Sequence, residues 1–196
     1  MKTVQQCFES ETEAKRSKFF AHLVPIGSFE EMRSQLRRKH PKASHIVWAA
    51  RFVNPHGQIV EESSDDGEPK GCAGRPVLHV MQGKELMQCA VLVVRYFGGI
   101  KLGTGGMARA YSAAAQAVAA AAELKVFERR AAIHFFTAFG VMRRWEHFLE
   151  SVGDLKVDRT FRSDGTAWSL EGGETAVKRV EKALKEARID FSVEYH

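Results

Sequence analysis

Apolar and polar positions alternate along the first part of the chain in a way that predicts several regular elements. Short apolar segments predict strands at residues 19–24 and 46–53. A helix between them begins near Ser28, which stands three residues before a glutamate in the spacing of a capping box. The continuous apolar run at residues 90–96 is typical of a strand covered on both faces. The alanine-rich stretch at residues 107–123 predicts a long buried helix.

The stretches between these elements have no regular apolar period. Residues 54–57 read Asn-Pro-His-Gly and predict a turn. Residues 61–71 are acidic and predict a loop, and residues 76–81 predict a short helix or turn packed under it. Residues 98–106 are rich in glycine and predict a loop that leads from the apolar strand into the alanine-rich helix.

A second pattern begins near residue 130. It predicts strands at residues 131–137, 155–161, 168–170 and 189–195 and helices at residues 141–152 and 174–187. Asp164 and Gly165 are a strong hairpin signal between the second and third of these strands. The order β-α-β-β-α-β is the plan of a ferredoxin-like domain. We therefore predict two domains, at residues 1–129 and 130–196.

Composition and charge narrow the class of protein. The net charge is +5 and the pI is about 9.2, a mild basic excess compatible with nucleic acid as a partner. No apolar run approaches the roughly 18 residues that span a bilayer, and the N-terminus lacks the apolar core of a signal peptide. We expect a cytoplasmic protein without a membrane partner. The cysteines and histidines show no zinc-type spacing, so we expect no metal and no cofactor.

The glycine-rich loop has two interpretations. Its glycines can serve a tight strand-to-helix turn. Alternatively, they leave backbone amides free at a helix start, where the amides and the helix dipole favour an anion such as phosphate. We favour an anion or nucleic-acid site, because cations coincide with the helix start. The predicted ligands are Arg95, Gly98, Gly99, Lys101, Gly103, Thr104, Gly105, Gly106 and Arg109. The loop is not a Walker A motif, since no Gly-Lys-Ser/Thr follows at the required spacing.

The acidic loop carries Asp65, Asp66 and Glu68. These acids could form a solvated surface turn, could hold a divalent metal, or could pair with Arg75 or Arg95 and brace the neighbouring site. Adjacent aspartates in extended chain point in opposite directions, which disfavours a joint metal site. We therefore expect a site without a metal or a catalytic residue. The residues that we interpret as bracing it are Asp65, Asp66, Glu68 and Arg75.

Cys72 is the remaining candidate for chemistry in this region. A nucleophilic cysteine needs an activating base nearby, and His45 is the residue that could serve as one. A small buried side chain is the commoner role for a single cysteine. We therefore predict no catalytic function for Cys72.

These motifs resemble the signature of the IMPACT/YigZ family. The resemblance rests on Asp65-Asp66-Gly67-Glu68-Pro69, Ala73-Gly74-Arg75-Pro76 and the run from Arg95 to Gly106, with Arg16-Ser17-Lys18-Phe19 and His40-Pro41 upstream. The bacterial branch is the most similar in length and in its second domain. Cys72 stands where the family usually has threonine, and Ile46-Val47-Trp48 replaces a more polar stretch.

The resemblance implies an α+β fold and a class of function. It implies a two-layer, ribosomal-protein-type α/β domain, shared with an elongation factor G domain and GHMP kinases. It also implies a ferredoxin-like second domain resembling the fifth domain of elongation factor G. Eukaryotic members regulate translation, so we expect a non-catalytic protein that contacts RNA or the ribosome and could also have a protein partner in translation control. The alternatives are an enzyme of phosphoryl transfer or hydrolysis that uses the glycine loop, and a protein-interaction module docked through the acidic loop.

Overall fold

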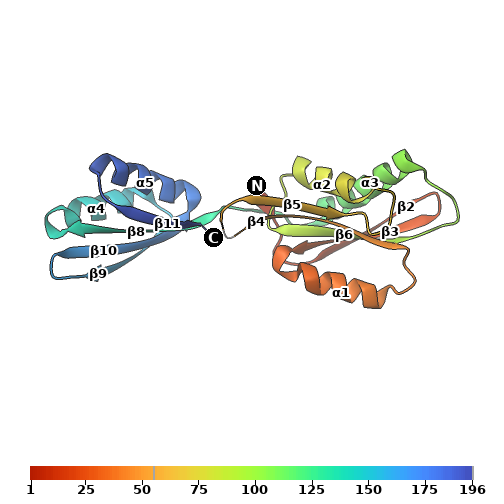
Figure 1. The fold of residues 1–196 in the computed structure, drawn as a ribbon, viewed down its shortest axis with the longest axis horizontal. Coiled ribbons are helices and arrows are strands. Elements are labelled where there is room, and N and C mark those ends of the chain that lie inside the picture. Colours follow the sequence, from red (N-terminus) through yellow and green to blue (C-terminus); the bar gives the residue numbers. More distant parts are fainter. Residues whose placement is uncertain (55, 196) are drawn as a thin grey trace. The chain divides into compact units, whose positions relative to one another are not determined.

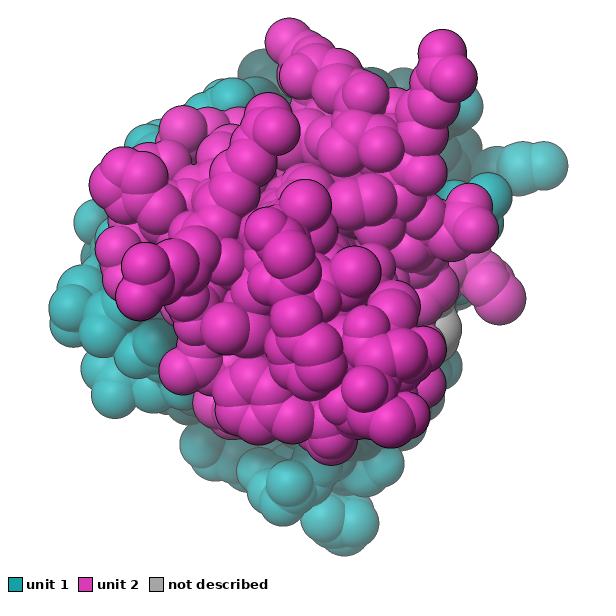
Figure 2. Space-filling view, turned by 90° about the vertical axis from the view of Figure 1, so that its left-hand side faces the viewer, with its two compact units in different colours: residues 1–54, 58–127 teal, residues 55–57, 128–196 magenta. Residues whose placement is uncertain are grey.

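The chain folds into two compact units. The computed structural model describes residues 1–54 and 56–195. Unit 1 comprises residues 1–54 and 58–127, and unit 2 comprises residues 55–57 and 128–196 (Figure 2). None of the described helices is long and apolar enough to cross a membrane.

Unit 1 is built on an antiparallel sheet of five strands. Their order across the sheet is β2 (Phe8–Ala14), β3 (Ser17–Pro25), β6 (Cys89–Tyr96), β4 (His45–Val53) and β5 (Ile59–Ser64). A separate short ladder pairs β1 (Lys2–Thr3) with β7 (Lys125–Val126). The central position of β6 explains its continuous apolar sequence, because both of its faces are covered.

Helices cover both faces of this sheet (Figure 1). Helix α1 (Phe29–Lys39) lies on one face, over a cluster that includes Val24, Ile46 and Leu92. Helices α2 (Gly74–Gly83) and α3 (Thr104–Ala121) lie on the other, over a larger apolar cluster. The mixed α+β class is as predicted, but unit 1 has three layers instead of two, because α1 buries its own apolar face on the side of the sheet away from α2 and α3.

Several local predictions differ from the structure. The strands β2 and β5 were not predicted. Both are edge strands of the sheet, and the exposed face of β2 is glutamate-rich. Ser28 directly precedes α1 as expected, but it is the last residue of the 3-10 turn Ile26–Ser28 and its side chain makes no capping hydrogen bond. The turn predicted at residues 54–57 includes Pro55, which lies outside the described residues. Around it, Asn54 and Gln58 are joined by a backbone hydrogen bond of 2.9 Å.

Unit 2 has the predicted ferredoxin-like order. Its strands are β8 (Arg130–Ala138), β9 (Leu155–Phe161), β10 (Gly165–Gly173) and β11 (Phe191–Tyr195), with the order β11-β8-β10-β9 and antiparallel pairing throughout. Helices α4 (Phe139–Val152) and α5 (Glu174–Ala187) pack on the sheet. Trp145 and Trp168 lie in the apolar core, as their positions on the predicted apolar faces indicated.

Candidate functional site

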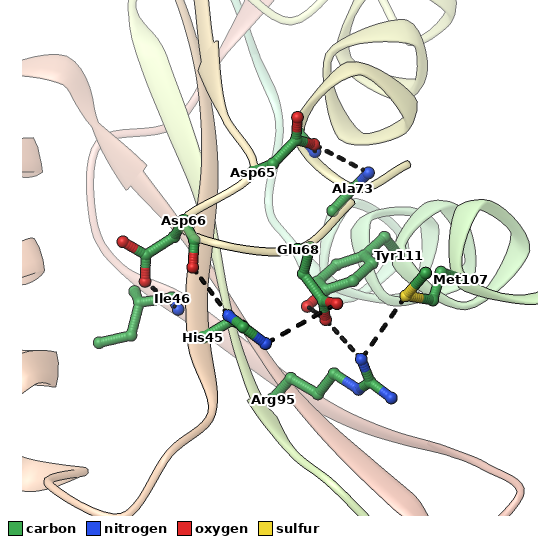
Figure 3. A network of polar contacts seen from close by, with 10 residues as sticks. His45, Ile46, Asp65, Asp66, Glu68, Ala73, Arg95, Met107 and Tyr111 are labelled. Atoms are coloured by element: carbon green, nitrogen blue, oxygen red, sulfur yellow. Dashed lines mark hydrogen bonds and ion pairs between the residues drawn. The ribbon is translucent and has the colours of Figure 1, made fainter. Parts of the chain in front are cut away.

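Glu68 is the centre of a buried network in unit 1 (Figure 3). Its side chain is 3% exposed and lies 2.5 Å from Nη1 of Arg95, a residue of the central strand β6. The hydroxyl of Tyr111, on helix α3, donates a hydrogen bond of 2.8 Å to the same carboxylate oxygen. Nε2 of His45, on β4, lies 3.8 Å from the other oxygen. The carboxylate therefore joins the acidic loop to two strands and one helix.

Tyr111 is held as a neutral hydroxyl by this environment. Burial raises its pKa first, and the negative charge of Glu68 and the hydrogen bond to it raise the pKa further. The ring packs edge-on against Phe19 with centroids 5.2 Å apart. A neutral donor that is buried beside a carboxylate serves to fix that carboxylate in place.

Asp66 faces away from Glu68 and fixes the loop to the opposite side of the sheet. Its Oδ2 accepts a 2.7 Å hydrogen bond from the Ile46 amide, and its Oδ1 accepts one of 2.8 Å from Arg37 on α1. Its carbonyl oxygen lies 2.7 Å from Nδ1 of His45. The residue has a positive φ of 44°, which is uncommon outside glycine and marks a constrained turn.

Asp65 caps helix α2. Its carboxylate accepts hydrogen bonds from the amides of Gly71, Ala73 and Gly74, at 2.7, 3.0 and 2.8 Å. Burial alone would raise its pKa, but the three amides together outweigh burial and lower the pKa. The two adjacent aspartates thus contact different elements.

The three acids of the loop are all engaged by the protein itself. Of the two predicted arginine partners, Arg95 pairs with Glu68, whereas Arg75 is exposed and forms no described ion pair with the acids. Groups of metal-ligating side chains within the described residues do not include the acidic loop. Cys72 packs against the apolar core on the α2 side. Within this loop, Glu68 joins β6 to α3, Asp66 contacts β4 and α1, and Asp65 caps α2.

The glycine loop ends at an exposed start of helix α3. Gly103 precedes the helix with a φ of +72°, a conformation that favours glycine. Within the described residues no side chain caps this helix, and its first turn contains no acid. The residues Lys101, Gly103, Thr104, Gly105 and Arg109 are exposed. The amides of the first turn are therefore open to a ligand.

Arg109 adds a positive charge at this helix start. Nη1 of its guanidinium lies 3.5 Å from the position that a Cβ on Gly105 would take. The side chain therefore runs back along α3 toward the first turn. Amides and a guanidinium at one place form an arrangement that binds phosphate.

A second basic segment, not included among the predicted ligands, also lies beside this loop. Lys15 and Arg16 form the two-residue turn between β2 and β3, with positive φ values of 45° and 66°. A Cβ placed on Gly98 would lie 2.1 Å from the Arg16 carbonyl carbon, so the two backbones are in close contact. Positive φ at both central residues is the favoured geometry of a two-residue hairpin turn. The turn therefore brings two exposed cations next to the glycine loop.

Arg95 does not share the exposure of the other predicted ligands. It is 6% exposed, and its charge is matched by Glu68. Its guanidinium also lies 5.7 Å from the ring centroid of Phe97, which is 51% exposed at the start of the loop. Arg95 therefore contacts the glycine loop from its buried side, and the Phe97 ring is exposed to solvent.

Comparisons with known proteins agree with this architecture. Residues 15–119 match the family described as the Impact N-terminal domain. The chain is 36% identical to an "IMPACT family member" of Haemophilus influenzae, over 71% of this chain and 69% of that protein. It is 38% identical to the "IMPACT family member YigZ" of Escherichia coli, over 50% of each protein. A solved structure described as that of a hypothetical protein aligns with a TM-score of 0.65 and 23% identity, over 98% of this chain and 95% of the other.

The fold and the site define a class of protein. It is a two-unit α+β protein with a ferredoxin-like second unit, and its acidic loop is neutralised internally beside an open helix start. The family match extends over more than half of the chain, and the Haemophilus relative is matched over more than two thirds of its length. The chain belongs to the IMPACT family.

Proposed function

We propose that this chain is a non-catalytic binding protein that contacts RNA or the ribosome through the glycine loop of unit 1. The observation that carries the proposal is the uncapped start of helix α3, flanked by the exposed cations Lys101 and Arg109. An exposed helix start offers unpaired amides and the positive end of the helix dipole to an anion.

The chemistry of the site favours phosphate over a carboxylate side chain of a partner. Amides of Thr104, Gly105 and Gly106 can donate to several oxygens of one phosphate, and Arg109 can add a charge-assisted hydrogen bond. The turn at Lys15 and Arg16 extends the positive surface beyond a single phosphate. A row of cations of this kind suits the backbone of a nucleic acid.

Phe97 supports a single-stranded ligand. Its ring is exposed beside the cations, and an exposed aromatic ring can stack on an unpaired base without selecting its identity. Double-stranded RNA has its bases stacked inward and would leave the ring without a partner. The ligand class is therefore an RNA segment with at least one accessible base, such as a loop of ribosomal RNA.

Membership of the IMPACT family supports a place for this contact in the translation apparatus of the cytoplasm, with regulation of translation as the role. The alternative of a phosphoryl-transfer enzyme needs a carboxylate free to hold a metal. Asp65, Asp66 and Glu68 instead accept hydrogen bonds from the protein, which favours binding without catalysis.

The experiment that tests this function measures binding of single-stranded RNA and of ribosomes at low salt. The variant is Lys101→Ala with Arg109→Ala. The matched control is Arg38→Ala with Lys42→Ala, which removes the same charge from exposed positions in and after α1. We expect the Lys101→Ala and Arg109→Ala pair to lower the affinity for RNA and ribosomes at least tenfold. The slope of log affinity against log salt concentration should become shallower by about 0.7 per lost phosphate contact. Equal affinities for both pairs would contradict the proposal.

A further inference from the structure

A second cluster of chemically reactive side chains lies on the α1 face of the sheet in unit 1. Cys7, Glu9 and His22 each offer one ligand atom, and these atoms lie within 4.8 Å of one another. Glu9 and His22 are direct partners across the β2–β3 ladder, so their side chains share one face. Cys7 precedes Phe8, the first residue of β2. The cluster is at the opposite end of β2 from the Lys15–Arg16 turn, so it is separate from the glycine loop.

The placement of His22 is the observation that points to a ligand. Its neighbours on the same face of β3 are Phe20 and Val24, which pack in the apolar cluster under α1. The residue is only 4% exposed, and neither ring nitrogen has a hydrogen-bond partner within the part of the chain that the structure describes. Nδ1 lies 3.2 Å from Oε1 of Glu9, although not in the geometry of a hydrogen bond. Buried polar groups in native proteins are nearly always satisfied, so an unsatisfied imidazole indicates a missing partner.

The three side chains are better suited to binding one transition-metal ion together than to pairing with one another. We propose that Cys7, Glu9 and His22 form a binding site for one zinc ion. Thiolate, imidazole and carboxylate are the ligand types of zinc, whereas magnesium and calcium require oxygen ligands. Tetrahedral zinc with bonds of about 2.0–2.3 Å holds its ligand atoms roughly 3.5 Å apart. Closing the cluster from its present spacing therefore needs side-chain adjustment of about 1 Å and no change in β pairing.

The surroundings supply the remaining requirements of such a site. A cavity of about 220 Å³, lined by Cys7, Val24 and Gln35 among others, opens on the Cys7 side of the cluster. With three protein ligands, the fourth zinc position is left for water or for a donor from a partner. The thiol of Cys7 releases its proton when the metal binds.

The first test is titration of the metal-free full-length chain with ZnCl₂, followed by the spectrum of the Co²⁺-substituted protein. We expect one zinc per chain and a thiolate-to-cobalt charge-transfer band. Cys7→Ser removes that band and weakens zinc binding at least about tenfold, and Glu9→Gln weakens it by a similar factor. Both positions are exposed, so these variants leave the core intact. Cys72→Ser is the matched control and leaves both readouts unchanged.

The second test uses the three cysteines as internal reporters of alkylation by iodoacetamide. Cys7 is exposed, Cys72 is partly exposed and Cys89 is buried. We expect ZnCl₂ to slow the modification of Cys7 at least tenfold and to leave the rate at Cys72 unchanged. Absence of saturable binding, or equal losses in Cys7→Ser and Cys72→Ser, would overturn the proposal. RNA binding through the glycine loop is unaffected by either result, so the two proposals fail separately.

Discussion

The Tyr111 hydroxyl donates a hydrogen bond of 2.8 Å to the Glu68 carboxylate, and so connects the acidic loop to the helix that begins at the glycine loop. The same carboxylate oxygen lies 2.5 Å from the Arg95 guanidinium. The acidic loop is thus connected to the glycine loop through α3 and β6. The acids themselves do not face the proposed RNA-binding surface. The coupling positions α3 relative to β6, and with it the exposed amides.

Removing the charge of Glu68 tests this coupling. Glu68→Gln leaves Arg95 buried without its counter-charge, and breaking a buried pair in this way costs about 3–5 kcal/mol. The expected result is a loss of that order in the free energy of unfolding of unit 1, measured by hydrogen exchange of the β6 amides. Glu62→Gln, at an exposed position of β5, is the control and should change stability by less than about 0.5 kcal/mol.

The companion variant for this pair replaces both partners. Glu68→Gln with Arg95→Met leaves no unpaired charge in the core, and we expect it to recover part of the stability lost in the single variant. If the double variant is destabilised by the sum of both single losses, Glu68 and Arg95 do not act as a pair.

The cap of helix α2 gives a prediction that depends on pH. The pKa of Asp65 is lowered in the folded chain, so its stabilising contribution is complete above the unfolded value of about 3.9 and is lost as the pH falls through the folded pKa. Asp65→Asn should therefore lower the free energy of unfolding by about 1 kcal/mol at pH 7, because a neutral amide is a weaker acceptor than a carboxylate. The difference from the parent chain should shrink below about pH 4. Denaturant unfolding at both pH values measures it, and a constant difference would rule out the ionised cap.

Gly98 provides a test of the contact between the glycine loop and the β2–β3 turn. A methyl group there would meet the Arg16 backbone at 2.1 Å, which the structure cannot accommodate without moving the turn. We expect Gly98→Ala to destabilise unit 1 by about 1–3 kcal/mol. Gly83→Ala is the matched control, since nothing lies within 4 Å of its Cβ position and it ends a helix. That control should be neutral or stabilising by up to about 1 kcal/mol in the same thermal unfolding measurement.

The elements that could be predicted from sequence are those with a strong apolar period. The run that became β6 and the alanine-rich α3 are buried on wide faces, so their composition reflects their burial. Strand β2 was missed because its exposed face carries Glu9, Glu11 and Glu13, and its identity depends on pairing with β3. The third layer of unit 1 was missed for a related reason, because an apolar helix face does not reveal which side of a sheet it covers.

The sites were predictable to different degrees. Glycines and cations next to a helix start indicated the exposed surface around Lys101 and Arg109, and adjacent aspartates indicated divergent roles. Sequence spacing could not place Arg16 beside Gly98, since that contact joins the β2–β3 turn to the loop after β6. It also could not associate Cys7 and Glu9 with His22, because the association depends on the register of β2 against β3.

In the proposed binding mode, phosphate of a single-stranded RNA binds at the amides that begin helix α3. The most direct measurement is the change of backbone amide chemical shifts when the full-length chain is titrated with a short single-stranded RNA. We expect the largest saturable shifts at Thr104, Gly105 and Gly106, together with a shift at Phe97 from base stacking. These shifts should be lost when Lys101 and Arg109 are replaced by alanine. Saturable shifts confined to other surfaces, with these amides unmoved, would contradict it.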